Sequence, residues 1–322
     1  MTITRRTLTV LICTHNRSSL LLRTLQYLNT ARRPQGWLVD TFVVANACTD
    51  NSLQSLQQFR EKNKDGLPLN WIEEPTPGKS HALNRALPLI ESEMVAFVDD
   101  DHRVDSDYLV NICAAAENYP DAELFCGRIL PDWDGSEPAW IHETGAYRIY
   151  PLPVPRFDQG EVPLCLTAEI AIPGGGNLFL KVEWLSRIGP FSNDLGPTGH
   201  DLEGSEDLDW VLRGLRLGAR LQYVPSVVQY HYVDLERLRL LYLIKKAYKR
   251  TASTTALKAV PGGKRVPLYL YRKLGEYLFF AMTALSADRR RFYLVRTAAA
   301  LGEMKGYRQR QVTVKKLNNE KY

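Results

Sequence analysis

Apolar runs that alternate with helical patterns predict an α/β fold for the first hundred residues. Residues 8–13 form a short run of strand-forming residues, and the next such runs are TFVVAN and MVAFV. Between them, apolar residues recur at helical spacing in SSLLLRTLQYLNTA, around residues 52–60 and in HALNRALPLI. Strands and helices that alternate through short loops are typical of a parallel sheet covered on both faces.

The pattern changes along the rest of the chain. Residues 131–173 are rich in Pro, Trp and Gly without sustained periodicity, which indicates either an irregular insertion over a site or a weakly patterned β region. The Gly-rich turn PGGGN leads into a strand-like run, and a helix is expected over 208–217. Helical spacing dominates from residue 235 onward. We therefore predict a first domain over 1–236 and a helical region over 237–322.

Charge separates the same two parts. The chain of 322 residues is 45% hydrophobic and 24% charged, which excludes a disordered or collagen-like protein. Its net charge of +5 conceals a segregation, because residues 237–322 hold 21 Lys and Arg against 4 Asp and Glu, a net of +17. The preceding residues carry −12. An acidic part followed by a basic part indicates two different roles.

The cysteines and apolar stretches favour a reducing, cytoplasmic setting. The 5 cysteines are odd in number and widely spaced, so we expect buried free thiols. The N-terminal apolar run is too short for a signal peptide. The longest uncharged apolar stretch near the C-terminus, residues 277–287, falls short of the roughly 18 to 20 residues that span a bilayer. We expect no membrane-spanning segment.

Three adjacent acids, Asp99, Asp100 and Asp101, follow the third predicted strand. Ligands of parallel α/β sheets bind beyond the carboxyl ends of the strands. Adjacent carboxylates repel one another unless cations offset the charge, and such an oxygen-rich site suits Mg²⁺ or Mn²⁺. The alternative is a loop that caps the next helix; we assign that role to residues 105–107 and metal binding to the three acids.

A second acidic pair, Glu206 and Asp207, stands at the start of a predicted helix. The helix dipole favours carboxylates there, so capping alone would explain the pair. The preceding segment GPTGHDLEG predicts an accessible helix start, which favours a general base. His231 ends an extended segment, and it becomes a candidate metal ligand only because a metal site is already predicted.

Taken in order, these segments resemble the family-2 glycosyltransferases of the GT-A fold. The resemblance runs from about Leu8 to His231, and each motif alone is weak, whereas six in this order are specific. They are THNR, VVANACTDNS, PGKSHALNRAL, FVDDDHRVDSDYL, PGGGNLFLKVEWLSRIGPF and GSEDLDWVLRGLRLGARLQYVPSVVQYH. The resemblance implies a Rossmann-like, mainly parallel sheet flanked by helices, followed here by a basic helical extension.

The resemblance also implies transfer of a sugar, with inversion, from a nucleotide-diphosphate-sugar donor to an acceptor hydroxyl. Asp99 and Asp101 match the family's Asp-x-Asp element, which binds the ribose and a divalent ion, Mg²⁺ or Mn²⁺. Asp207 would be the base, with Glu206 beside it, and His231 would lie near the metal. The residues expected to bind the nucleotide and its phosphates are Thr14, His15, Asn16, Asn46, Asp50, Lys79, Asp99 and Asp100. Many relatives carry Asp where this chain has Ala45, so base recognition is expected to shift.

The basic region 237–322 has two interpretations that stay open. Its basic, aromatic helices suit an anionic membrane surface, which a lipid-linked sugar acceptor would favour. Alternatively they pack on the first domain and point their lysines into water. A nucleic-acid partner is not expected, because no nucleic-acid-binding motif is present. The QxxRW element of processive synthases is absent too, so we expect an enzyme that adds one sugar at a time. We expect it to act in bacterial polysaccharide or glycolipid synthesis. Its expected location is the cytoplasm, peripheral to the inner face of the cell membrane.

Two other functions compete with sugar transfer. A haloacid-dehalogenase-like phosphohydrolase also has a strand that ends in Asp-x-Asp, but near its N-terminus and with Thr or Val where this chain has Arg103. The other is a non-catalytic scaffold that binds nucleotide sugars or membranes. The joint presence of Asp99, Asp101, Asp207 and His231 argues against it.

Overall fold

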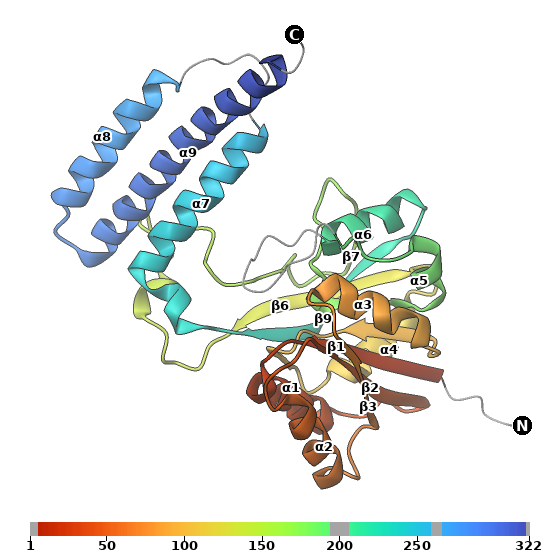
Figure 1. The fold of residues 1–322 in the computed structure, drawn as a ribbon. Coiled ribbons are helices and arrows are strands. Elements are labelled where there is room, and N and C mark those ends of the chain that lie inside the picture. The colour runs from red at the N-terminus through yellow and green to blue at the C-terminus, as the bar shows by residue number, and fades with distance from the viewer. Residues whose placement is uncertain (1–5, 194–205, 259–265, 320–322) are drawn as a thin grey trace, which may run out of the picture. The chain divides into compact units, whose positions relative to one another are not determined.

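The computed structural model describes residues 6–193, 206–258 and 266–319. The chain forms two compact units: unit 1 comprises residues 1–132 and 155–232, and unit 2 comprises residues 133–154 and 233–322. Figure 1 shows the elements of both. The segment 133–154, which the sequence analysis kept in the first domain, groups with the C-terminal helices.

Unit 1 is built on one sheet, in which the described residues form nine strands in the order β3-β2-β1-β4-β8-β6-β9-β5, with β7 paired to β9. The strands are β1 (Arg6–Thr14), β2 (Trp37–Asn46), β3 (Leu69–Glu74), β4 (Met94–Phe97), β5 (His102–Val104), β6 (Leu124–Asp132), β7 (Leu164–Leu166), β8 (Leu178–Lys181) and β9 (Leu221–Tyr232). The first four pair in parallel: β1, β2 and β4 were predicted, whereas β3 was not, and β8 is antiparallel to both β4 and β6. The sheet is therefore parallel on one side and mixed on the other.

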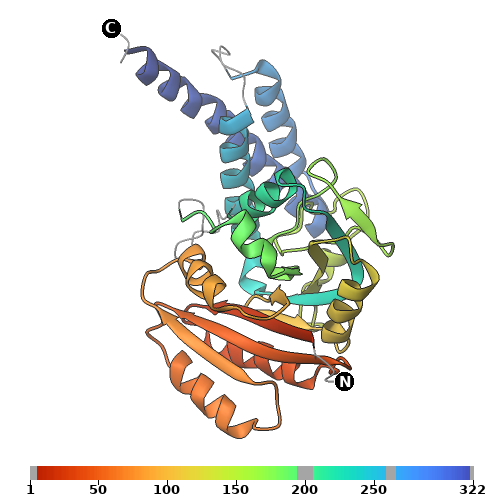
Figure 2. The ribbon, with the colours of Figure 1, turned by 90° about the vertical axis from the view of Figure 1, so that its right-hand side faces the viewer.

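Helices cover both faces of this sheet, as the sequence predicts (Figures 1 and 2). Alternate residues of β1 enter different cores: Val10 and Ile12 join one, and Leu11 joins the other. The first core packs against α1 (Ser18–Thr30), α2 (Ser52–Lys62) and α4 (Tyr108–Asn118). The second packs against α3 (Lys79–Ala86), α5 (Glu183–Ile188) and α6 (Glu206–Arg216). Burial of both faces fixes the register of the parallel strands.

This register brings the polar strand ends together. The polar residues that follow β1, β2 and β4 lie at the same edge, because parallel strands share their carboxyl edge. The short strand β5 then turns back and pairs antiparallel with β9, which places His102 directly opposite His231. Residues from distant parts of the chain thus meet at one edge of the sheet.

Unit 2 is helical, with α7 (Leu240–Lys258), α8 (Leu268–Met282) and α9 (Ala287–Asn319). The short 3₁₀ helices η2 (Ala139–His142) and η4 (Leu235–Leu238) complete it. Helices α7 and α9 approach closely at Gly302, where an added Cβ would lie 2.2 Å from the carbonyl oxygen of Tyr248. Within the described ranges, none of the helices is long and apolar enough to cross a bilayer.

The cysteines are all free, as expected. Cys113 and Cys126 are buried, and Cys13 and Cys48 are half-buried. The prediction of burial is wrong for Cys165, which is exposed. It lies at the middle of the three-residue strand β7, where the side chain alternates away from the core.

Candidate active site

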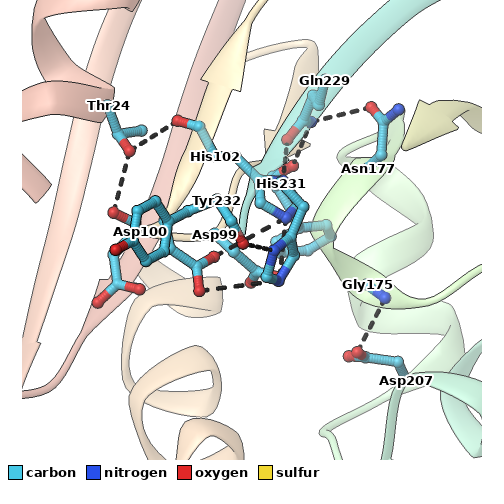
Figure 3. A network of polar contacts seen from close by, with 12 residues as sticks. Thr24, Asp99, Asp100, His102, Gly175, Asn177, Asp207, Gln229, His231 and Tyr232 are labelled. Atoms are coloured by element: carbon cyan, nitrogen blue, oxygen red, sulfur yellow. Dashed lines mark hydrogen bonds and ion pairs between the residues drawn. The ribbon is translucent and has the colours of Figure 1, made fainter. Parts of the chain in front are cut away.

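The three adjacent acids lie between β4 and β5 in different environments; Figure 3 labels Asp99 and Asp100. Asp100 is 5% exposed and points inward, where it accepts hydrogen bonds from Thr14 Oγ1 at 2.7 Å and Arg17 Nη1 at 3.1 Å. Burial, with repulsion from Asp101, raises the pKa of Asp100 to about 6 against the opposing effect of Arg17. Asp99 makes neither of these contacts and instead lies beside Lys79. The middle acid thus anchors the loop.

Lys79, at the start of α3, lies between Asp99 and Asp207. Its Nζ is 2.8 Å from Asp99 Oδ1 and 3.8 Å from Asp207 Oδ2. Burial opposes the charged ammonium, but the carboxylates of Asp207 and Asp99 outweigh it and hold the pKa of Lys79 well above its ordinary value. Burial likewise opposes the charge of Asp99, but Lys79 lowers its pKa below the ordinary range. The acids at the end of β4 and the start of α6 therefore belong to one site.

A group of metal-ligating side chains lies beside this bridge. One ligand atom each of Asp101, His102 and His231 lie within 4.8 Å of one another. Asp101 is 3.9 Å from His102 Nε2 and 3.7 Å from His231 Nε2, measured from its two carboxylate oxygens. Asp99 Oδ2 lies 3.8 Å from His102 Nε2, at the edge of the group. The structure thus brings the predicted ligands Asp101 and His231 together and adds His102.

Hydrogen bonds on the far side of each ring orient both histidines toward this group (Figure 3). His102 Nδ1 contacts Gln229 Oε1, while Gln229 Nε2 donates to Tyr108 Oη at 2.7 Å and to Asn177 Oδ1 at 2.9 Å. Because the amide of Gln229 donates elsewhere, its oxygen must accept, and Nδ1 carries the proton. In the neutral ring the lone pair is then on Nε2 of His102, which is buried and has no hydrogen-bond partner among the described residues.

The same logic applies to His231. Its Nδ1 lies 2.6 Å from the carbonyl oxygen of Tyr232, which can only accept, so Nδ1 carries a proton and the lone pair of the neutral ring is on Nε2. Burial lowers the pKa of His231, against the attraction of Asp101, and favours the neutral ring. Two imidazole nitrogens and one carboxylate are ligands that suit a transition-metal ion, and metal-binding histidines usually donate their other ring N–H to an oxygen in this way.

The turn PGGGN closes the site from the side of β8, and its glycines are needed for close approach. The amide of Gly175 donates to Asp207 Oδ2 at 2.8 Å. An added Cβ would lie 2.3 Å from Asp207 Oδ1 at Gly175, and 2.4 Å from Asp99 Oδ2 at Gly176. At Gly174 it would meet nothing within 4 Å. Side chains at the second and third glycines would therefore displace both acids.

Glu206 and Asp207 open α6, as predicted, but they do more than cap it. Glu206 is 2% exposed, and burial together with the charge of Asp207 raises its pKa. Glu206 Oε2 and Asp207 Oδ1 are buried without a hydrogen-bond partner among the described residues. Unpartnered buried carboxylate oxygens are costly, so they indicate a place where a ligand donates. The Gly-rich segment expected to open this helix start, residues 196–204, lies outside the described residues.

The residues predicted to bind the nucleotide gather at the ends of β1 and β2. Asn46 is 4% exposed; its Oδ1 accepts from the amide of Gly78 at 2.8 Å, and its Nδ2 donates to the carbonyl of Thr76 at 2.6 Å. His15 Nδ1 lies 2.7 Å from the carbonyl oxygen of Asn46. Asn46 therefore ties β1 and β2 to the loop before α3.

Asn16 and Asp50 connect neighbouring loops in the same way. Asn16 has a positive φ of 53°, and its Oδ1 accepts from the amides of Thr49 at 2.7 Å and Asp50 at 3.1 Å. Asp50 in turn accepts from the amide of Ser18 at 3.3 Å. These side chains shape the edge next to the acids; that they and Thr14 bind a nucleotide stays a prediction.

His102 is the site residue to which the sequence analysis assigned no role. His102 directly follows the three acids in the sequence, yet its hydrogen-bond partner Gln229 is 127 positions away. Lys79 was expected to contact phosphate, and the structure shows it first as the cation between two acids. Neither contact can be recognised from local spacing.

The fold and the site together define a glycosyltransferase of the GT-A type. Residues 5–258 match the family described as Glycosyltransferase like family 2. The chain belongs to this family, which confirms the resemblance seen in its motifs. A search of the curated proteins finds no match.

Solved structures with the same fold include three that carry a donor, a nucleotide or a metal. The mannosyltransferase PcManGT from Pyrobaculum calidifontis, in complex with GDP-Man and Mn²⁺, is 20% identical with a TM-score of 0.52, over 96% of this chain and 84% of that chain. TarS 1–349 of S. aureus with UDP-GlcNAc is 17% identical with a TM-score of 0.51, over 96% and 91%. GalNAc-T7 with UDP, GalNAc and Mn²⁺ is 14% identical with a TM-score of 0.52, over 81% and 52%. These likenesses confirm the predicted GT-A fold.

Proposed function

We propose that the protein transfers a sugar from a nucleotide-diphosphate donor to an acceptor hydroxyl with inversion at the anomeric carbon. The observation that carries the proposal is the bridge through Lys79, which unites the Asp-x-Asp loop with Asp207 in one site. Membership of the family supports sugar transfer. The donors bound by PcManGT and TarS support a nucleotide sugar as the substrate.

In this proposal Asp207 is the general base. Gly175 holds Oδ2, and Oδ1 is buried without a hydrogen-bond partner in the described part of the chain, so Oδ1 is the oxygen that accepts the proton of the acceptor hydroxyl. Burial, together with the charge of Asp207, raises the pKa of the neighbouring Glu206. The acceptor oxygen bonds to the anomeric carbon while the bond to the diphosphate breaks and its electron pair leaves with the diphosphate. A single displacement inverts the configuration.

Asp101, His102 and His231 would hold a divalent ion, with Asp99 beside them at the ribose and diphosphate. Such an ion offsets the charge of a departing diphosphate. Two imidazole nitrogens favour Mn²⁺ over Mg²⁺, which prefers oxygen ligands. The Mn²⁺ complexes of PcManGT and GalNAc-T7 support this choice. Lys79 would turn from the acids to the phosphates when a donor is bound.

The remaining parts of the proposal concern the nucleotide and the acceptor. Thr14, His15, Asn16, Asn46 and Asp50 would line the pocket for the nucleoside at the ends of β1 and β2. The acceptor hydroxyl would belong to a growing polysaccharide or glycolipid of a bacterium. We propose a cytoplasmic enzyme that works one addition at a time at the inner face of the membrane.

The test measures release of nucleoside diphosphate from GDP-mannose, UDP-GlcNAc and related donors, with Mn²⁺, with Mg²⁺ and with a chelator. We expect release with at least one donor, highest with Mn²⁺ and lost with the chelator. His102→Gln should raise the Mn²⁺ concentration for half-maximal activity by about 10- to 100-fold. His142→Gln is the matched control, since His142 lies in unit 2, where its exposed ring contacts Glu137. Hydrolysis of phosphate monoesters with no release from any nucleotide sugar would instead establish a phosphohydrolase.

A further inference from the structure

Unit 2 contains an open cavity that the proposed sugar transfer does not use. Its volume is about 460 Å³, which is in the range of ligand-binding sites. It lies where the start of α9 meets η4 and the segment around η2, so its walls all come from unit 2. Both the charge and the apolar surface of these walls indicate a ligand.

The charge of the cavity comes from three arginines: Arg239, Arg290 and Arg291. No acidic side chain is among its described lining residues. Arg239 pairs with Glu236 at 2.6 Å, and Arg291 pairs with Asp288. Arg290 has no acidic partner in the described part of the chain, and it donates to the carbonyl oxygen of Ala284 at 3.3 Å. Guanidinium groups outnumber carboxylates here, and the planar guanidinium suits a phosphate.

The rest of the wall is apolar. The Trp140 ring lies with its centroid 4.8 Å from the guanidinium carbon of Arg291. Leu238 is 4% exposed and belongs to the buried cluster of unit 2 together with Val233. Leu240 also lines the cavity. A fully hydrated sugar phosphate would gain nothing from such a wall, whereas a hydrocarbon chain would leave water on contact with it.

Exposed apolar side chains also lie in the turn that precedes α9 and on α8. Leu285 in this turn is 100% exposed, and Met282 at the end of α8 is 75% exposed. Leu268 and Phe279, 84% and 57% exposed, lie on the same face of α8 as Met282, because their spacings are multiples of a helical turn. Figure 1 shows that α8 is joined to the start of α9 by this short turn. Apolar faces flanked by basic residues are typical of helices at a lipid surface.

We propose that this cavity binds an amphiphile with a phosphate head and a hydrocarbon chain. The head would contact Arg290 and Arg291, and the chain would follow Trp140 toward the exposed turn. Such a molecule is either a membrane phospholipid or a lipid-linked sugar phosphate. In the second case the proposal rests on the proposed function and names the class of its acceptor. Its test measures binding alone, so its failure is distinct from a failure of sugar transfer.

The first experiment is calorimetric titration of the full chain with n-decyl phosphate below its micellar concentration, beside inorganic phosphate and n-decanol. Arg290→Gln should weaken binding of n-decyl phosphate about tenfold or more, since a charged hydrogen bond is lost. The matched control is Arg296→Gln, an exposed arginine of the same helix that lies over Phe292 and outside the cavity. It should change the affinity less than about twofold. Equal losses in both variants, or inorganic phosphate bound as tightly as n-decyl phosphate, would overturn the proposal.

The second experiment distinguishes the two sources. The protein is sedimented with phosphatidylcholine vesicles that contain phosphatidylglycerol or, separately, a polyprenyl phosphate. Retention by phosphatidylglycerol vesicles that is lost in Arg290→Gln and kept in Arg296→Gln identifies a membrane lipid as the occupant. The same pattern with polyprenyl phosphate vesicles alone identifies the lipid-linked molecule. Retention by neither, or retention that does not depend on Arg290, contradicts the proposal.

Discussion

Unit 1 buries polar groups, whereas unit 2 exposes apolar ones. In unit 1 the side chains of Asp100, His102 and Gln229 are at most 5% exposed, and each has a hydrogen-bond partner that orients it. In unit 2 Leu268 and Leu285 are 84% and 100% exposed. Burial of polar groups costs stability and is retained where a fixed geometry is needed. Exposed apolar groups are retained where a surface has to bind. Under the two proposals, unit 1 carries the chemistry and unit 2 binds the amphiphile.

The largest expected effect is confined to unit 1. Asp207→Asn removes the base while Gly175 still holds the side chain, so the transfer rate should fall about 10²- to 10⁴-fold. Steady-state release of nucleoside diphosphate measures this loss, and donor affinity should stay nearly constant. Asp209→Asn, on the same helix and paired with Arg213, is the control and should keep its activity. An Asp207→Asn variant that keeps its activity would show that Asp207 is not the general base.

The second prediction tests whether activity needs the close approach of Gly176 to Asp99 and His102 in unit 1. In Gly176→Ala the new Cβ would lie 2.4 Å from Asp99 Oδ2 and 2.9 Å from His102 Cε1, so both side chains must shift. Displacement of about 1 Å at a catalytic group costs on the order of 10²-fold in rate. The same assay applies, with Gly174→Ala as the control, since an added Cβ there meets nothing within 4 Å. Equal rates in the two variants would show that the close approach is not needed.

Gly302→Ala addresses unit 2 alone. The new Cβ would lie 2.2 Å from the carbonyl oxygen of Tyr248, so α7 and α9 must separate, and we expect the free energy of unfolding to fall by about 1 to 3 kcal/mol. Gly275→Ala on α8 meets nothing within 4 Å and should instead stabilise by about 0.5 to 1 kcal/mol. Thermal unfolding measures both. Loss of donor binding in Gly302→Ala would contradict the division of roles between the units.

The smallest effect concerns an ion pair in unit 1. Burial works against the charged Asp158, but bonds from Arg156, Gly160 and Arg128 outweigh it and lower the pKa of Asp158 to about 2. A carboxyl with a lowered pKa stabilises the fold above its unfolded pKa, so Asp158→Asn should cost about 2 kcal/mol at pH 7. The cost should shrink as the pH falls from about 4 toward 2.

Urea unfolding at several pH values measures this dependence. Asp121→Asn removes a mostly exposed partner of Arg220 and should change the free energy of unfolding by less than about 1 kcal/mol. A cost for Asp158→Asn that stays constant down to pH 3 would exclude the ion pair as its cause.

Local patterns of the sequence predicted much of unit 1. The strands that end at Thr14 and Asn46, the acids after β4, and the carboxylates at the start of α6 were all expected where the structure has them. Each depends on neighbouring residues: alternation buries a strand, and the dipole of a helix attracts acids to its first turn. The parallel sheet then brings the strand ends together without further information.

Contacts between distant residues could not be predicted in this way. His102 owes its role to its register opposite His231 and to its bond with Gln229. From the sequence, Lys79 was expected to contact phosphate, whereas the fold places it between Asp99 and Asp207. The segment 133–154 has no periodicity, so only packing could assign it to unit 2.

The sequence by itself determined the class of fold, the edge of the sheet that carries the chemistry and the acids that belong to it. Only the tertiary structure decided which nitrogen faces the candidate metal site, which cation joins the two acids, and where arginines meet an apolar cavity. The physical reason is that periodicity and strand ends follow from adjacent residues. Ion pairs, tautomers and cavities follow from side chains that folding brings together over a hundred or more positions.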